Sequence, residues 1–267
     1  MMKRKFYMKK SLLLCATAAI LSSCASSFSV QGSSSVSSLD GNKLYLRTIK
    51  NNELKCLDSC DVIHGQFSFN GVLDTVRMAS LYMGDESLMP IVLEGGEITI
   101  KIDNASQTVG GTPLNEKLYK FLDKHKQLDN QLAELSHKQS QMLLDGIDEN
   151  TIEEQLSAEA AKIAAEEDKL VTTFIVENFD NVLGPGVFMM MTSSYKYPIL
   201  TPQIEDIMSK ATSKFKDNPY VKDYYQTANE NEAKMQGLEP GQATEPSVPQ
   251  TPSPQQPQLP TLNTPQQ

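Results

Sequence analysis

The stretch Gly110-Gly111-Thr112-Pro113 divides this 267-residue chain into two patterns. Before it, apolar and polar residues alternate in short runs, which is the period of half-buried strands. After it, leucines recur every three or four residues, as in an amphipathic helix. Thr112 is a favoured N-cap residue, and Pro113 suits the first helical position because that position needs no N–H donor. We therefore expect a β-domain over residues 28–111 and a helical region over residues 112–236.

The β-domain is predicted to contain about seven short strands. The clearest are Lys43–Ile49 and Gln66–Asn70, in which every second side chain is apolar. Turn residues such as Asp40-Gly41-Asn42 separate the runs. Pro90 suits an edge strand or a strand break, because proline cannot donate a ladder hydrogen bond. This spacing of strands and turns predicts a small antiparallel β-sandwich.

The helical region opens with two long amphipathic stretches, which predict an antiparallel αα-hairpin with coiled-coil character. The seam of the first stretch is Leu114, Leu118, Phe121, His125, Leu128, Leu132, Leu135, Gln139 and Met142. The second is expected to begin at a capping box formed by Thr151 and Glu154. At ~1.5 Å per residue each helix is about 40 Å long, so part of the pair projects beyond the β-domain. The predicted fold class is α+β.

The rest of the chain is expected to hold shorter helices and a disordered tail. Gly184-Pro185-Gly186 is predicted to be a turn, and helices are expected from Gln203 to Lys216 and from Pro219 to about Lys234. Residues 237–267 are rich in proline and glutamine. They contain too little apolar surface to offset the entropy of ordering, so we expect a disordered tail.

The chain begins with a basic segment and a short apolar run. Five positive charges and no acid lie within residues 1–10, and residues 11–21 are largely apolar. This is the pattern of a secretory signal peptide. The run is shorter than the roughly 20 residues that span a bilayer. Residues 1–23 are therefore predicted to be a signal peptide, with Met8 as an alternative start.

The run ends in Leu21-Ser22-Ser23-Cys24, which resembles the lipobox of bacterial lipoproteins. In that interpretation Cys24 is diacylated and becomes the mature N-terminus, followed by a short linker over residues 24–27. Two or three acyl chains anchor firmly, at ~0.8 kcal/mol per buried methylene. The alternative is an ordinary cleaved signal with a chance cysteine. No acidic cluster of the kind that resembles a surface-export signal follows Cys24, which favours the periplasmic side of the envelope.

The net charge of the chain indicates which classes of partner it can bind. The net charge is −9, and the leader carries five positive charges, so the remainder is near −14. An acidic chain without a basic cluster is a poor ligand for nucleic acid and for anionic lipid surfaces. We therefore expect no nucleic acid, membrane contact through the anchor at Cys24, and an envelope protein of unknown identity as partner.

Cys56 and Cys60 are the thiols left once Cys15 and Cys24 are assigned to the leader and the lipid site. Four residues of strand span ~13 Å, whereas a disulfide needs Cα atoms within ~7 Å. We predict two small thiols, buried or half-buried, on one strand face. A tight turn at Asp58-Ser59 would still allow a disulfide, so a redox role for the pair stays open.

The remaining residues that could catalyse a reaction or bind a ligand are also explained by ordinary structural roles. His64, His125 and His137 form no metal-binding spacing with one another or with a cysteine, and His125 falls on the helical seam. The acidic runs of the second long helix are typical of solvated helix faces. The apolar run Phe188–Met191 suits core packing or a soft binding surface. We predict no catalytic residue, no cofactor and no metal site.

Several turn and strand motifs together resemble one family. They are Phe28–Gly32, Leu57–Val62, Gly65–Gly71 and Leu93–Ile98, all after a lipobox. The family is the domain of unknown function 4369, the N-terminal β-domain of lipid-anchored, thioredoxin-like thiol–disulfide oxidoreductases of gut Gram-negative bacteria. The helical stretch up to about residue 225 resembles the linker of the same proteins.

This chain departs from that family after the linker. The resemblance implies a following thioredoxin-like domain with Cys-x-x-Cys, yet here the sequence passes into the Pro/Gln tail. Oxidoreductase activity is therefore not carried over. The favoured hypothesis is a non-enzymatic binding or accessory module. The alternatives are a thiol–disulfide redox accessory that uses Cys56 and Cys60, and a structural spacer at the membrane.

The lipobox interpretation predicts the outcome of a single substitution. Cys24→Ala removes the thiol that would carry the acyl chains, so the protein should leave the membrane fraction or accumulate with its leader uncleaved. Fractionation of cell envelopes, followed by immunoblotting, measures both effects. Ser23→Ala serves as the control, because alanine keeps a small residue before the cysteine. A Cys24→Ala protein that fractionates like the wild type contradicts the interpretation.

Overall fold

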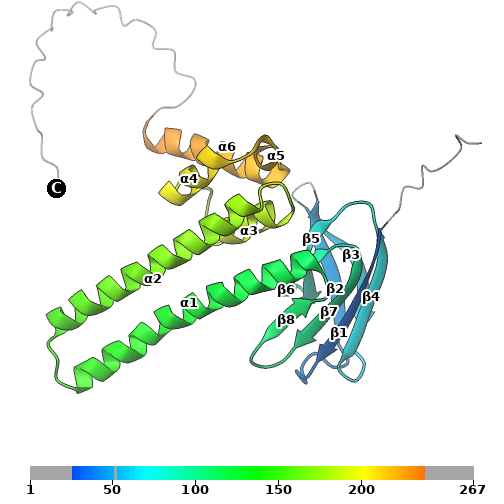
Figure 1. Cartoon of the computed structure of the whole chain (residues 1–267), viewed down its shortest axis with the longest axis horizontal. Coiled ribbons are helices and arrows are strands. Elements are labelled where there is room, and N and C mark those ends of the chain that lie inside the picture. The colour runs from blue at the N-terminus through cyan, green and yellow to red at the C-terminus, as the bar shows by residue number, and fades with distance from the viewer. Residues whose placement is uncertain (1–25, 51–52, 238–267) are drawn as a thin grey trace, which may run out of the picture.

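The computed structural model describes residues 26–50 and 53–237. Within these ranges the chain forms a β-sandwich followed by a helical region from which a long hairpin projects (Figure 1). This confirms the α+β fold class. Cys24, the predicted signal peptide and residues 238–267 of the predicted tail lie outside the described residues. No helix in the described ranges is long and apolar enough to cross a membrane.

The sandwich consists of two four-stranded sheets, with strand orders β4-β1-β7-β8 and β3-β2-β5-β6. The strands are β1 (Ser26–Ser34), β2 (Lys43–Lys50), β3 (Glu53–Asp61), β4 (Gln66–Leu73), β5 (Arg77–Met83), β6 (Glu86–Leu93), β7 (Gly96–Ile102) and β8 (Gln107–Gly110). Alternate residues of the two sheets meet between the layers, and Leu44, Leu81, Ile98 and Ile100 are fully buried there. The predicted alternation therefore builds the core.

Two features of the sandwich differ from the prediction. There are eight strands in the described residues instead of about seven, since the four-residue β8 was too short to show a pattern. The sheets are also not purely antiparallel, because β1 pairs with β7 in parallel. A parallel pair needs a long connection, and here that connection is the chain from β2 to β6, which builds the other sheet and β4.

The described helical region has six helices. They are α1 (Pro113–Leu144), α2 (Glu149–Glu177), α3 (Leu183–Thr192), α4 (Pro202–Lys210), α5 (Ser213–Lys216) and α6 (Pro219–Met235). The long hairpin of α1 and α2 is present as predicted, but its second helix begins differently. Asp148 is the N-cap and accepts from the Thr151 N–H at 3.0 Å, so the proposed capping box of Thr151 and Glu154 is wrong.

Two further expectations for the short helices are wrong. The predicted helix from Gln203 to Lys216 is divided into α4 and α5, because Thr212 caps a second start by accepting from the Phe215 N–H. Gly184-Pro185-Gly186 is not a turn but part of the first turns of α3. A proline is tolerated there because the first N–H groups of a helix have no intrahelical partner.

A second core holds the helices together. Phe121 of α1 stacks on Phe174 of α2 with ring centroids 4.3 Å apart. Phe188 of α3 meets Phe215 and Tyr224 edge-on at 5.6 Å and 5.5 Å. Val92 of β6 belongs to this core and not to that of the sandwich, since its side chain points out of the sheet. The two cores therefore share the sheet that contains β6.

The start of α1 is hydrogen-bonded to the edge strand β6 through Asn115 and Val92, and we call this contact the Asn115 lock. Asn115, which is fully buried, accepts from the Val92 N–H at 2.8 Å and donates to the Val92 carbonyl at 2.7 Å. Two residues earlier on β6, the Pro90 carbonyl accepts from the Tyr119 hydroxyl at 2.9 Å. Burial raises the pKa of Tyr119, which keeps the phenol a neutral donor. Pro90 thus lies on an edge strand, as predicted, and leaves no N–H to satisfy.

A carboxylate that directly follows β6 caps the same helix. Glu94 accepts from the N–H groups of Leu114 and Asn115 at 2.8 Å and 3.1 Å. Thr112 occupies the N-cap position as expected, but its hydroxyl makes no capping bond and instead accepts from the Asn115 amide at 2.9 Å. A negative charge at a helix N-terminus is favourable. The cap of α1 is therefore supplied by the residue after β6, 20 residues before Leu114.

This lock predicts that Asn115 is essential for stability. In Asn115→Ala, the N–H and carbonyl of Val92 lose their partners in a buried site, and each such loss costs about 1–3 kcal/mol. We expect the free energy of unfolding, measured by urea denaturation, to fall by roughly 2–5 kcal/mol. Asn130→Ala is the matched control, because Asn130 is exposed on the same helix. An equal effect of the two substitutions would refute the role of the lock.

Candidate functional site

A cleft of about 270 Å³ lies between the outer face of the β2–β5–β6 sheet and helix α3. Its floor is formed by residues of β2 and β5, and one wall by α3. Its lining includes Arg47, Thr48, Ile49, Leu54, Val76, Arg77, Met78, Tyr82, Gly186, Met189 and Met190. We call this space the sheet–helix cleft.

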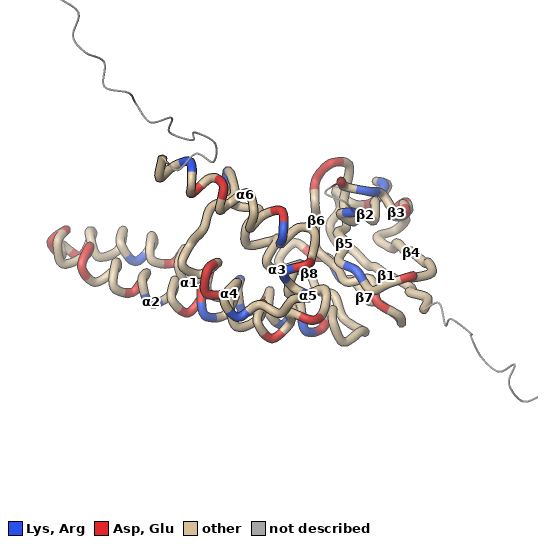
Figure 2. The backbone as a smooth tube through the Cα atoms, turned by 90° about the horizontal axis from the view of Figure 1, so that it is seen from above, with Lys and Arg blue, Asp and Glu red and all other residues tan. Residues whose placement is uncertain are grey.

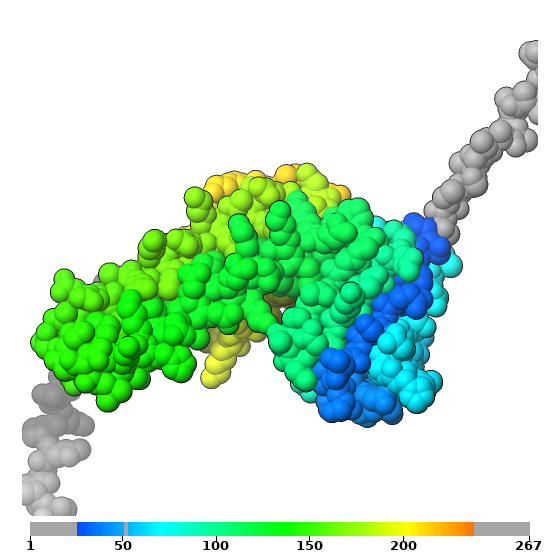
Figure 3. All heavy atoms as spheres, turned by 60° about the horizontal axis from the view of Figure 1, so that its bottom comes forward, coloured from blue at the N-terminus to red at the C-terminus, as the bar shows by residue number. Residues whose placement is uncertain are grey.

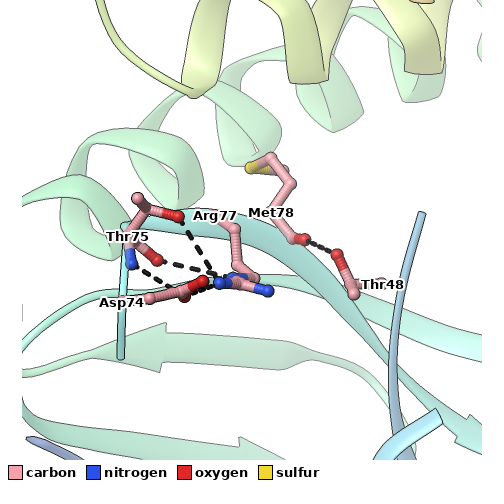
Figure 4. Close-up of polar contacts among 5 residues, drawn as sticks. All are labelled: Thr48, Asp74, Thr75, Arg77 and Met78. Carbon is pink, nitrogen blue, oxygen red and sulfur yellow. Dashed lines mark hydrogen bonds and ion pairs between the residues drawn. The ribbon is translucent and has the colours of Figure 1, made fainter. Parts of the chain in front are cut away.

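Small residues allow α3 to pack close to the sheet. A Cβ on Gly186 would lie 2.7 Å from the Met78 side chain, so only glycine allows α3 this close to β5. A Cβ on Gly184 would lie 2.4 Å from the Asn178 carbonyl, where α2 ends. In Figure 4 the Met78 side chain points towards the helices, while its carbonyl accepts from Thr48 on β2 at 2.7 Å. Met78 is therefore the contact on which α3 rests.

Arg47 presents a guanidinium group at the floor of the cleft. Its guanidinium carbon lies 5.0 Å from the Tyr45 ring centroid and 4.8 Å from that of Tyr82. Cation–π contacts of this kind hold an arginine in place without neutralising it. Its ion-pair partner Asp85 lies 3.5 Å away and is fully exposed, so solvent screens that attraction. Arg47 can therefore still interact with a negative group of a ligand.

Arg77 provides a second guanidinium group on β5. Figure 4 shows it gathered against the turn before the strand, where it pairs with Asp74 and donates to the Thr75 carbonyl and hydroxyl at 3.4 Å. About a quarter of the side chain, 23%, is exposed. Arg77 is held by Asp74 and Thr75 of the preceding turn, so its main role is to order the β4–β5 turn at the mouth of the cleft.

Exposed apolar side chains line the mouth of the cleft. Ile49 and Leu54 on β2 and β3 are 48% and 49% exposed, and Val76 and Met190 are 40% and 37% exposed. Most apolar side chains that are exposed on a soluble protein are scattered singly. Here four converge on one cleft from the sheet and the helix. This grouping gives the cleft an apolar mouth.

The Met-rich run contributes to both the core and the cleft. Phe188 is fully buried in the helical core, as the core interpretation requires. Met189 and Met190 line the sheet–helix cleft, and Met190 and Met191 also line a neighbouring cavity of about 430 Å³ beside α1 and α2. The core interpretation is therefore confirmed for Phe188, whereas a binding surface formed by Met189–Met191 stays a prediction. The thioethers of Met189–Met191 form a deformable wall between two cavities.

Cys56 and Cys60 are free thiols on β3, and they do not share a strand face. A bulge in the β2–β3 pairing places Cys56 opposite Arg47 and Cys60 opposite Leu44. Residues opposite each other point to the same side of a sheet, so Cys56 faces outwards and Cys60 packs towards the core. The prediction of one shared face is wrong because the bulge adds a residue between them. Burial raises the pKa of Cys60, which disfavours the reactive thiolate.

His125 lies at the α1–α2 interface with two carboxylates. Its Nδ1 lies 3.0 Å from an Asp129 oxygen, and its Nε2 lies 3.0 Å from a Glu167 oxygen. Ligand atoms of these three residues lie within 4.8 Å of one another, the one such group of possible metal ligands in the described residues. His125 and Glu167 line the 430 Å³ cavity, and none of the three residues lines the sheet–helix cleft. We describe the group as a polar bridge between α1 and α2.

The fold and the cleft define an α+β protein whose sandwich carries helices on one sheet. Residues 28–118 match a family model described as "Domain of unknown function (DUF4369)". The family resemblance stated from the motifs is thereby confirmed for these residues. The match continues past the last strand to Leu118, so it includes the Asn115 lock on β6. No curated protein and no solved structure matches the chain.

The positions of the two thiols predict different reactivities. In native protein at pH 8, Cys56 should react with a thiol reagent at least about tenfold faster than Cys60, because it is exposed while Cys60 is half-buried with a raised pKa. Reaction kinetics of chains that lack Cys24 and carry Cys60→Ser or Cys56→Ser measure each thiol separately. The two rates should converge in urea. Equal rates in the native state, or loss of both thiols to a disulfide, would contradict this structure of β3.

Proposed function

We propose that this protein is an envelope lipoprotein that acts as a non-enzymatic binding module. In this proposal Cys24 anchors it to a membrane, on the periplasmic side, and the sheet–helix cleft binds an apolar, acidic segment of an envelope protein. The observation that carries the proposal is the convergence of Ile49, Leu54, Val76 and Met190 around the Arg47 guanidinium. Apolar side chains that group in this way on a surface mark interaction sites.

The chemistry of the cleft supports an acidic ligand. Arg47 is held by stacking on two tyrosines, so a carboxylate that enters the cleft meets a guanidinium that is already oriented. Elsewhere on the described chain, basic and acidic residues are interspersed along the backbone (Figure 2). The positive group in the cleft therefore provides local selectivity, and apolar contact provides most of the affinity.

The lining also supports binding in preference to catalysis. Among its described residues it has hydroxyl groups and two guanidinium groups but no imidazole, thiol or carboxylate. General acid–base catalysis depends on a group that exchanges a proton near neutral pH. Such a cleft can hold and orient a ligand through charge and apolar contact. This argument concerns the sheet–helix cleft alone.

The two alternatives from the sequence rest on other parts of the chain. A redox accessory would use Cys56 and Cys60, which lie on opposite faces of β3 and are both free. A structural spacer would use the α1–α2 hairpin, which projects from the sandwich in Figure 1. Both stay predictions. A structural spacer does not need an arginine in an apolar cleft. Experiments on the cleft therefore distinguish a binding module from a spacer.

The binding proposal predicts a capture experiment in cells. A photo-crosslinking amino acid at Val76, at the mouth of the cleft, should yield a defined product with one envelope protein. Ile49→Glu or Met190→Glu should reduce that product at least about tenfold, because a carboxylate pressed against an apolar surface costs more than the ~1.4 kcal/mol of a tenfold change. Arg47→Gln should also weaken it, since the amide keeps the planar shape but not the charge.

Val72→Glu is the matched control for these substitutions. Val72 is 73% exposed on β4, in the other sheet, so an added carboxylate there leaves the cleft unchanged. The crosslinked product should be as abundant in this variant as in the wild type. A product that all four substitutions reduce equally, or that none reduces, would overturn the assignment of the cleft as the binding site.

A further inference from the structure

The outer half of the α1–α2 hairpin contains a second, larger open surface. A groove of about 680 Å³ runs between the two helices near their connection. We call it the hairpin groove. One wall is formed by Leu132, Leu135, Ser136, Gln139 and Leu143 of α1, and the other by Glu149, Ile152, Glu153, Leu156, Ser157 and Ala160 of α2. It is separate from the sheet–helix cleft, which shares none of these residues.

Two helices alone leave the apolar residues of this groove exposed. Leu132 and Leu143 are 41% and 47% exposed, although they belong to or adjoin the predicted leucine seam. Near the body of the protein the same seam is covered, since Phe121 is only 5% exposed beneath the helical core. In the outer half no third element of the described chain packs on it, and Figure 3 shows the hairpin extending clear of the sandwich. Helical hairpins usually bury such a face in a bundle of four helices.

We propose that the hairpin groove is the dimerisation surface of this protein and that its occupant is the hairpin of a second copy. The two hairpins pack face to face, with their tips at the same end, around a twofold axis parallel to the helices. This arrangement forms a four-helix bundle. It covers Leu132 and Leu143 of each copy with the α2 wall of the other. It also leaves both sandwiches at one end of the bundle.

The charges of the groove select this orientation. Glu149 and Glu153 lie on the α2 wall, whereas the α1 wall carries the uncharged Ser136 and Gln139. With the twofold axis along the hairpin, α2 of one copy faces α1 of the other, so Glu153 lies over Gln139. An axis perpendicular to the hairpin would pair α2 with α2 and bring like charges together, which is destabilising. Lys138 and Glu159 pair across the two helices and do not line the groove.

The size of the surface predicts a reversible dimer. The α1 wall runs from Leu132 to Leu143, which is about 17 Å at ~1.5 Å per residue. A contact this short belongs with the weak, transient interfaces, which bury less than ~1,200 Å². We therefore expect monomers and dimers in equilibrium at micromolar concentrations. Copies that share a membrane would meet at a higher effective concentration.

Sedimentation velocity of the full-length chain in detergent tests the proposal. The wild type should shift from monomer to dimer as its concentration rises. Leu132→Glu/Leu143→Glu should stay monomeric over the same range, because it adds two carboxylates to the apolar wall. Both leucines are substantially exposed, so the substitutions should leave the helices intact, and far-UV circular dichroism checks this. Gln131→Glu/Gln141→Glu adds the same charge to α1 outside the groove and should dimerise like the wild type.

Cysteine crosslinking in cells tests the orientation independently. Two tagged chains that both carry Cys56→Ser and Cys60→Ser are co-expressed, one with Gln139→Cys and the other with Glu153→Cys, and mild oxidation should join them. Two differently tagged chains that both carry Gln139→Cys should not crosslink, because in this arrangement the two α1 helices lie diagonally. Gln141→Cys paired with Glu153→Cys is the control for chance collision and should also fail.

Three results would overturn the proposal. The first is a wild type that is monomeric at every concentration and forms no crosslink between residues 139 and 153. The second is a dimer that survives Leu132→Glu/Leu143→Glu. The third is a crosslink from the groove to a different protein in place of a second copy. Because none of the substituted residues lines the sheet–helix cleft, each result leaves the proposal for that cleft untouched.

Discussion

The hydrogen bonds between Asn115 and Val92 are the constraint on which the rest of this structure depends. An edge strand that is covered by a helix loses water from its outward N–H and carbonyl groups, and those groups must find partners. One amide side chain satisfies both groups of Val92, while Tyr119 satisfies Pro90 and Glu94 caps the helix. The direction in which α1 leaves the sandwich is thereby set, and every later helix takes its position from α1.

The sheet–helix cleft follows from this geometry. Because α1 and α2 leave past β6, α3 returns onto the outer face of the same sheet and stops at Met78, where Gly186 allows close contact. The helices cover β6 and part of β5 but not β2 and β3. The outward side chains of β2, including Arg47 and Ile49, are left beside the end of the helical layer. The cleft is therefore the boundary between the covered and uncovered halves of one sheet.

The outer part of the α1–α2 hairpin leaves more of its leucine side chains exposed than the part near the sandwich does. Close to the body, Phe121 and Phe174 stack within the helical core. Beyond the polar bridge at His125, each long helix has only the other to pack against, and leucines become partly exposed. Helix stability comes mainly from packing of an amphipathic face. The outer hairpin therefore leaves leucines such as Leu132 and Leu143 exposed, whereas Phe121 and Phe174 of the inner part are buried.

The local patterns of the sequence were sufficient for the α+β class, the β-to-α boundary at Thr112-Pro113, the edge position of Pro90 and the hairpin of α1 and α2. Each depends on residues within a few positions of one another, which periodicity and turn chemistry can report. Only the tertiary structure decided how β1 pairs with β7, that Glu94 caps α1, and that the β3 bulge turns Cys56 and Cys60 to opposite faces. The sheet–helix cleft likewise joins β2 to α3 across more than a hundred residues. Strand register and the docking of distant segments depend on contacts that no local window contains, and for that reason the site could not be found from the sequence.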